Sequence, residues 1–144
     1  GFDLSIFLQG VGEANGYIAG AARHAFINES SNPQEIHLDR WRPENPGASY
    51  PRLTYGYSYN QRLSTFWLEN AAYLRLKNIQ VGYTVPKRIT EKYRMDRVRA
   101  YFSADNLLTK SDFFYGYDPE TPVSLGGFYP QVKTFVFGLN INFK

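Results

Sequence analysis

The feature that most constrains the fold is a two-residue alternation of side chains near the end of the sequence. Along residues 134–143 the apolar positions fall on one face of an extended chain, and small or polar positions fall mainly on the other. Successive side chains of a β-strand point to opposite faces, so this period indicates a strand rather than a helix. The predicted apolar face consists of Phe135, Phe137, Leu139, Ile141 and Phe143.

Three earlier segments alternate in the same way, at residues 2–9, 73–85 and 98–105. In the second of them the phase slips by one residue at Asn78, and the apolar positions then continue from Ile79. A one-residue slip moves every side chain to the other face, so a β-bulge is expected near Lys77 and Asn78. The predicted fold class is all-β with antiparallel strands, and Asp105-Asn106 is expected to bend the chain at a strand end.

The lengths of the strands and of their connections point to a particular kind of sheet. Strands of about ten residues match a tilted bilayer crossing, although alternation alone also fits a water-soluble β-sandwich. The connections alternate long, short and long: the first fills most of residues 11–72, the second begins at Pro86, and the third lies between Leu107 and Val132. Outer-membrane barrels pair short periplasmic turns with long outer loops. In one orientation both long connections lie outside the cell, and the last strand descends into the periplasm.

Three local elements are expected within the connections. The alternating stretch from Leu53 to Tyr59 and the stretch from Phe66 to Asn70 are predicted to form an extra hairpin. The Ala-rich stretch from Tyr17 to Phe26 is predicted to be a short helix, and the link after Pro86 a single helical turn.

Composition excludes several functions. The chain has no cysteine, which excludes disulfides and thiolate metal sites. Basic and acidic residues are interspersed and the net charge is only +3, so no nucleic-acid-binding face is expected. His24 and His37 have no cluster of ligands around them in the sequence and are interpreted as ordinary loop residues. No metal or cofactor is therefore expected.

Six stretches, in order along the chain, resemble the sequence blocks of SusC/RagA-type TonB-dependent receptors. The resemblance covers almost the whole sequence, and the order of the blocks makes it specific. It departs from the family pattern at Glu13, where the family usually has Gly, and at Lys144, which follows the terminal Phe. The blocks are Phe7 to Gly12, Trp41 to Pro46 with Tyr50 to Leu53, Ser64 to Pro86, Val98 to Thr109, Gly116 to Glu120 with Tyr129-Pro130, and Phe137 to Phe143.

This resemblance implies that residues 1–144 are the C-terminal strands of a large plugged β-barrel in the bacterial outer membrane, with long outer loops and one short helix. The plug and the earlier strands would lie outside this sequence. The family implies import of glycans or peptides, driven by the TonB system and assisted by a SusD-like lipoprotein that covers the outer loops. The isolated segment is expected to form an open sheet or a sandwich, and to self-associate through its open strand edges.

Two rival functions are weighed against import. A soluble carbohydrate-binding β-sandwich could use the same tyrosines. A glycoside hydrolase could use carboxylates such as Glu44, Asp118 and Glu120, which would have to be held at a set separation. Because Asp118 and Glu120 flank a proline in a loop, they are predicted to fix that loop, and no enzymatic activity is expected.

Two groups of residues are predicted to carry function. Tyr55, Tyr57, Tyr115 and Tyr117 lie in expected outer segments and are candidate contacts for substrate or for the lipoprotein lid. Interfacial aromatic girdles or plain packing would explain the same residues. Ile141 and Phe143, on the apolar face of the last strand, resemble the signal that the barrel-assembly machinery reads.

Overall fold

The structure is a computed structural model, and it describes residues 1–120, 127–129 and 131–143. The chain divides into two units, each compact in itself. We call the first, Gly1–Gly12 with Ala72–Ser111 and Pro130–Lys144, the sheet unit, and the second, Glu13–Ala71 with Asp112–Tyr129, the loop unit. The strands are β1 (Phe2–Val11), β2 (Asn15–Tyr17), β3 (Leu68–Asn70), β4 (Tyr73–Thr84), β5 (Met95–Ser111) and β6 (Thr134–Phe143).

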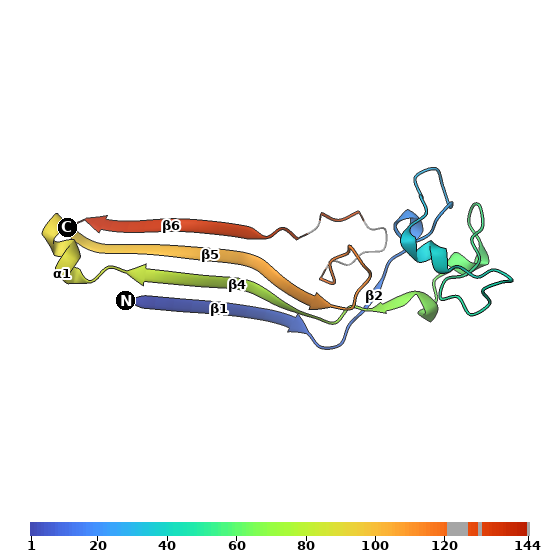
Figure 1. Ribbon diagram of the computed structural model, residues 1–144, viewed down its shortest axis with the longest axis horizontal. Coiled ribbons are helices and arrows are strands. Elements are labelled where there is room, and N and C mark those ends of the chain that lie inside the picture. Colours follow the sequence, from blue (N-terminus) through green and yellow to red (C-terminus); the bar gives the residue numbers. More distant parts are fainter. Residues whose placement is uncertain (121–126, 130, 144) are drawn as a thin grey trace. The chain divides into compact units, whose positions relative to one another are not determined.

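The sheet unit is a four-stranded antiparallel sheet in the order β1-β4-β5-β6 (Figure 1). Each strand pairs with the strand that precedes or follows it among these four, as a meander does. Both long connections leave the sheet at the end where Val11, Tyr73 and Ser111 are paired, and the short one closes the other end. The antiparallel fold and the open sheet predicted from the sequence are therefore confirmed.

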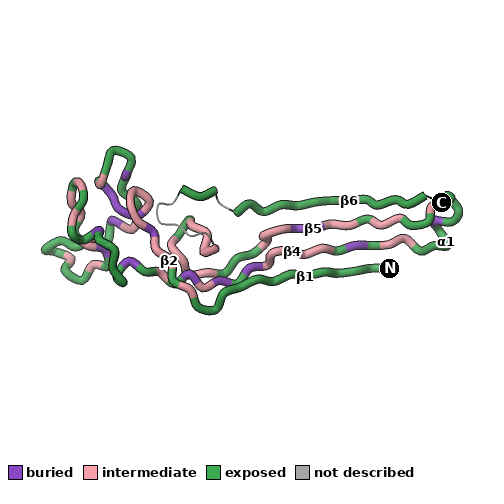
Figure 2. Tube along the Cα trace, turned by 180° about the vertical axis from the view of Figure 1, so that it is seen from behind, coloured by how far each residue is buried: buried purple, intermediate pink, exposed green. Residues whose placement is uncertain are grey.

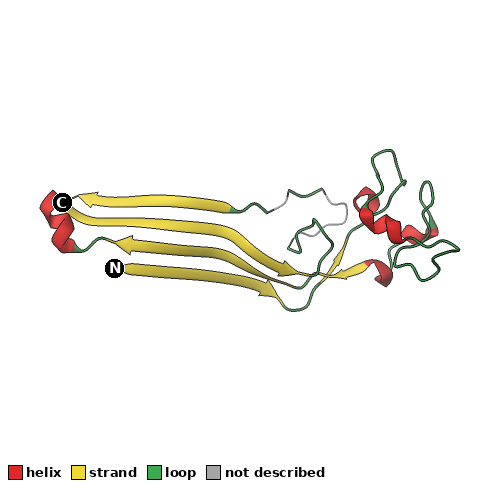
Figure 3. Ribbon diagram, viewed as in Figure 1, coloured by secondary structure: helices red, strands yellow, loops and turns green. Residues whose placement is uncertain are grey.

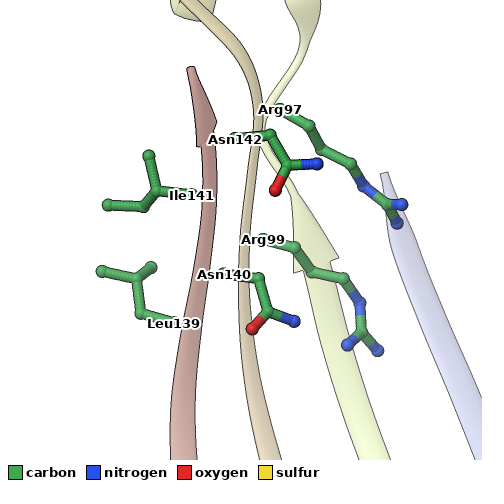
Figure 4. A pocket seen from close by; sticks show the side chains of 6 residues that line it. All are labelled: Arg97, Arg99, Leu139, Asn140, Ile141 and Asn142. Carbon is green, nitrogen blue, oxygen red and sulfur yellow. The ribbon is translucent and has the colours of Figure 1, made fainter.

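The register separates the sheet into an apolar and a polar face. Leu4, Val81, Phe102 and Phe137 are paired in one row across all four strands, so their side chains share a face. The neighbouring row, which points the other way, is Asp3, Gly82, Tyr101 and Gly138. Figure 4 shows the same division on β6, where Leu139 and Ile141 point away from the side that holds Asn140, Asn142, Arg97 and Arg99.

Burial is unequal between the two units. Most residues of β1 and β6 are exposed, as Figure 2 shows, and the large apolar side chains of these strands are open to the surroundings. Burying such side chains stabilises a protein by roughly 1.5–3 kcal/mol each. An apolar face this continuous is an interaction surface, because folded soluble chains rarely expose one.

Two irregularities keep the faces aligned along the strands. Phe7 pairs with Asn78 whereas Leu8 pairs with Leu76, so β4 contains one extra residue at Lys77 and the predicted bulge is confirmed. In the pairing of β4 with β5 a second extra residue occurs, this time on β5, where Asn106 has a left-handed backbone with φ of 52°. The predicted bend at Asp105-Asn106 thus lies inside β5 rather than at its end, because the ladder resumes and continues to Ser111.

Side chains on the polar face cross between strands. The Arg99 guanidinium of β5 donates to the Asp3 carboxylate of β1 at 2.5 Å and to the Gln80 side chain of β4 at 3.3 Å. The Tyr101 ring lies where a Cβ atom at residue 138 would be, which explains why β6 carries glycine at that position. The Arg99–Gln80 and Tyr101–Gly138 contacts join neighbouring strands, and the Arg99–Asp3 ion pair crosses β4, so this face adds side-chain contacts to the backbone ladder.

The short connection is helical, as predicted, but it forms two consecutive turns rather than one. It contains α1 (Lys87–Thr90) followed by a 3-10 turn at Glu91–Tyr93 (Figure 3). Arg94 then adopts a left-handed backbone with φ of 58°, which ends the turn and starts β5. Across the described residues, none of the helices has the length and apolar character that spanning a membrane requires.

Two local predictions in the long connection are wrong. The stretch from Tyr17 to Phe26 is not a helix: it holds the end of β2 and a 3-10 turn at Gly20–Ala22, and Gly20 has a φ of 62° that an α-helix cannot contain. The stretch from Leu53 to Tyr59 forms no strand, since Gly56 has a φ of 72°. The hairpin-like pair in this unit is instead β2 with β3.

The left-handed backbone of Asn106 leads to a stability prediction. Replacing Asn106 by Val or by Gly removes the same side-chain hydrogen bond to the Val132 carbonyl, but only Val is strained at positive φ. We expect Asn106→Val to lower the free energy of unfolding by about 1–3 kcal/mol relative to Asn106→Gly. Urea unfolding of the two variants measures the difference, and equal midpoints would contradict the strained bend.

Candidate functional site

The loop unit has its own small core, built from aromatic and imidazole rings. Trp67, His24, His37 and Tyr50 are all buried. The ring centroids of His24 and Trp67, and those of His37 and Tyr50, are each 4.7 Å apart with edge-to-face geometry. Such pairs contribute roughly 0.5–1.5 kcal/mol beyond their buried area. These contacts hold together segments that lie far apart in the sequence.

Hydrogen bonds fix the His37 ring as a neutral group. The Gln34 backbone N–H donates to His37 Nδ1 at 2.7 Å, so the proton of the ring is assigned to Nε2. Nε2 then donates to the Arg23 carbonyl at 2.8 Å. Burial is the largest influence on this ring and lowers the pKa of His37 below its usual value, which favours the same neutral form.

His24 and Tyr50 extend this network. His24 Nδ1 lies 2.7 Å from the Tyr50 hydroxyl, which in turn donates to the Arg23 carbonyl at 3.4 Å. In this assignment Nδ1 carries the proton and donates to the Tyr50 oxygen. Burial lowers the pKa of His24 to about 4 and raises the pKa of Tyr50 to about 12. Both groups are therefore neutral near pH 7, and the cluster is a hydrogen-bonded neutral core.

Arg23 brings a charge into this core and connects its parts. Its guanidinium donates to the Glu69 carboxylate at 2.6 Å, and its Cζ atom lies 4.9 Å from the Trp67 ring centroid and 4.7 Å from that of Phe114. Cation–π contacts with a desolvated guanidinium contribute up to roughly 2 kcal/mol. Phe114 belongs to the second stretch of the loop unit, so Arg23 holds the two stretches together.

The sequence-based interpretation of His24 and His37 as ordinary loop residues is wrong. Both are buried and hydrogen-bonded to groups 14 to 26 residues away. No spacing rule connects them with Tyr50 or with the Arg23 carbonyl, because their segments follow no regular period. The one local signal is the reciprocal capping of Gln34 and His37 around the 3-10 turn Glu35–Asp39.

A pocket of about 370 Å³ opens next to this core within the loop unit. Its size falls in the range that binds small ligands. Tyr55 is one of the residues that line it, together with polar and apolar side chains from three segments. The full lining is Phe26, Pro33, Gln34, His37, Leu38, Arg40, Leu53, Thr54 and Tyr55.

The four tyrosines predicted as contacts all belong to the loop unit. Tyr55, Tyr57 and Tyr115 are 91%, 72% and 95% exposed, whereas Tyr117 is half-buried and packs against Phe114 at 5.7 Å between ring centroids. Among the described residues, no ring contact joins these four tyrosines to one another. Their role as substrate or lid contacts therefore stays a prediction, and Tyr55 lines the pocket described above.

The carboxylates considered for catalysis have structural surroundings. The Asp118 carboxylate accepts a hydrogen bond from the Glu120 backbone N–H at 2.9 Å, which is the turn geometry that fixes a loop. Glu44 is exposed on the surface. Within the part of the chain that the structure describes, no three His, Asp or Glu side chains gather into a metal site.

Comparison with known proteins was made over the whole chain. No family model matches the sequence. The TonB-dependent receptor P3 of Formosa agariphila (strain DSM 15362 / KCTC 12365 / LMG 23005 / KMM 3901 / M-2Alg 35-1) is 30% identical over 99% of this chain. The TonB-dependent receptor P26 of the same strain is 29% identical over 98% of it. The chain spans 15% of the length of each of these curated relatives.

Solved structures give the same correspondence in three dimensions. The RagAB peptide transporter matches 98% of this chain with a TM-score of 0.76 and 26% identity. The RagAB peptide importer in its "open-open" state matches 99% with a TM-score of 0.78 and 26% identity. In both cases the match spans 16% of the other chain.

These matches show which class of protein the chain resembles. Its amphipathic antiparallel sheet aligns over nearly its whole length with a segment of TonB-dependent receptors, and receptors of this class reside in the outer membrane. The RagAB matches agree with these relatives, so the resemblance to SusC/RagA-type TonB-dependent receptors that was drawn from the sequence is confirmed.

The buried histidines make the loop unit sensitive to acid. Because burial holds the pKa of His24 near 4, against about 6.5 in an unfolded chain, protons bind the unfolded form more readily between these values. Stability of the loop unit is therefore complete above pH 6.5 and falls as the pH decreases towards 4. Hydrogen–deuterium exchange of residues 20–50 measures this loss, and we expect His24→Gln to flatten the pH dependence. An unchanged slope would contradict the buried neutral state.

Proposed function

We propose that this chain forms the C-terminal strands of the barrel of an outer-membrane importer, with the plug and earlier strands supplied by the rest of the receptor. The single observation that supports this most strongly is the match of nearly the whole chain to about 15% of two TonB-dependent receptors. The division of the sheet into an apolar and a polar face agrees with it.

In this proposal the apolar face of the sheet contacts lipid and the polar face lines the barrel interior. A membrane-spanning sheet must pair every backbone group and leave no edge in the lipid, so β1 and β6 pair with further strands of the receptor. Both long connections lie outside the cell, and α1 lies in the periplasm. Ile141 and Phe143, exposed on β6, act as the signal for the barrel-assembly machinery.

The receptor takes up glycans or peptides together with a SusD-like lipoprotein and uses energy from the TonB system. The RagAB matches support import, since RagAB is a peptide transporter. Tyr55, Tyr57 and Tyr115, being exposed, are available to contact the substrate or the lipoprotein. A transport role also agrees with the structural surroundings of Asp118 and Glu120.

The proposal is tested with the full-length receptor in its own cells. Uptake of labelled oligosaccharides and peptides is measured in a deletion strain carrying the wild type, Leu139→Lys or Asn140→Lys. A lysine facing lipid costs roughly 2–4 kcal/mol at the bilayer centre, whereas one facing the interior does not. We expect Leu139→Lys to lower the outer-membrane level of the receptor several-fold, and Asn140→Lys to leave it unchanged.

Uptake of one of the two substrate classes should be lost in the deletion strain and restored by the wild type and by Asn140→Lys. Uptake of both classes at the wild-type rate in the deletion strain would contradict the importer function. Equal outer-membrane levels of the two lysine variants would contradict the assignment of the faces, independently of transport.

A further inference from the structure

The pocket of the loop unit has the character of a ligand site. Five of its nine lining residues are apolar or aromatic, and Leu38 and Tyr55 among them are largely exposed. Ligand sites are concave, mostly apolar, and carry a few polar groups that orient the ligand. The lining comes from three separate segments, around Phe26, residues 33–40 and residues 53–55, so the pocket exists only when the loop unit is folded.

The backbone at the pocket wall is strained and held in place. Phe26 has a φ of 61°, a conformation that a bulky aromatic residue rarely adopts. Two hydrogen bonds hold it there: its N–H donates to the Ser31 carbonyl at 2.8 Å, and its carbonyl accepts from the Gly56 N–H, also at 2.8 Å. Strain of this kind costs about 1–3 kcal/mol and gathers at ligand sites, where it positions a side chain in advance.

Two polar side chains of the pocket, His37 and Gln34, are hydrogen-bonded within the loop unit. Both ring nitrogens of His37 are hydrogen-bonded within the loop unit. The Gln34 side chain takes part in the capping of its own turn and donates to the Ala22 carbonyl at 3.0 Å. His37 therefore has no ring nitrogen left for a ligand, whereas the exposed Gln34 amide keeps a second N–H.

Besides the exposed Tyr55 side chain, Arg40 and Thr54 have polar groups that can bind a ligand. Arg40 makes one hydrogen bond, from Nη1 to the His37 carbonyl at 3.3 Å, and no ion pair is found for it among the described residues. Thr54 Oγ1 is buried and has no hydrogen-bond partner in the same part of the chain. A buried hydroxyl without a partner costs free energy, so its presence at a pocket calls for a group that it would bind. Arg40 is the only cation of the lining.

We propose that this pocket binds the apolar C-terminal residue of a peptide, whose side chain packs against Phe26, Leu38 and Tyr55 while its carboxylate pairs with Arg40 and accepts a hydrogen bond from Thr54. The proposal deepens the import function and rests on it for its biological setting. A guanidinium binds a carboxylate through charge-assisted hydrogen bonds, which are about twice as strong as neutral ones.

The residues that line the pocket also argue against a neutral sugar as its ligand. A sugar ring presents several hydroxyl groups, and each needs a partner when water is removed. Arg40 gives the mostly apolar pocket one cation, which matches a single carboxylate on an apolar residue, whereas a neutral sugar has no charge to pair with it. The apolar lining and the single cation therefore favour the peptide, and digalacturonate, a sugar that carries carboxylates, is the competitor against which it is tested.

The test compares ligands that differ by one charge. Affinities of the full-length receptor for N-acetyl-leucyl-leucine, for its C-terminal amide and for digalacturonate are measured by calorimetry with the wild type and with Arg40→Gln, Thr54→Val and Arg52→Gln. Arg52 is an exposed cation of the same connection that does not line the pocket, so it is the matched control.

We expect Arg40→Gln to weaken binding of the free acid about tenfold or more, and Thr54→Val to weaken it by a smaller factor. Binding of the amide should be weaker in the wild type and unaffected by Arg40→Gln, and Arg52→Gln should change nothing. Equal affinity for acid and amide, or an Arg40→Gln variant that binds like the wild type, would overturn the proposal. The proposal would also be overturned if the wild type bound digalacturonate more tightly than the peptide acid and Arg40→Gln abolished that binding. If the full-length receptor bound the peptide as expected but did not import it, only the proposed transport function would be contradicted.

Discussion

The whole sheet depends on one constraint, that backbone groups pair strand to strand while side chains alternate between faces. The row from Leu4 through Val81 and Phe102 to Phe137 exists because the register is continuous across three ladders. A single slipped residue would reverse the faces. The structure absorbs the extra residue at Lys77 with a bulge and compensates on β5 at Asn106, so apolar and polar faces stay separate along the full strands.

The sheet could be predicted from the sequence because its information is local and periodic. Alternation located β4 and β6 to within a residue or two, and the phase slip at Asn78 located the bulge. Alternation failed for Leu53 to Tyr59, because a strand needs a partner as well as a pattern, and Gly56 turns the backbone away. The tyrosines there alternate without being paired.

The loop unit could not be predicted in the same way. Its core depends on contacts between His24, Tyr50 and Trp67, whose segments have no regular period and join through non-local hydrogen bonds and ring packing. The pocket depends on Phe26, whose left-handed backbone no sequence rule assigns to an aromatic residue. Sequence reasoning found Tyr55 by its residue type and expected location, but it had no means of finding Arg40 or Thr54 beside it.

Arg23 also has a consequence for the order of events during folding. Its guanidinium contacts Trp67 in the first stretch of the loop unit and Phe114 in the second, and β4 and β5 lie between these stretches in the sequence. The loop unit can therefore be completed only after both of those strands have been synthesised. Closing such a long loop carries an entropic cost that is lower once the intervening strands are paired as a hairpin. Pairing of β4 with β5 as a hairpin thus shortens the effective loop between the two stretches of chain that the loop unit must join.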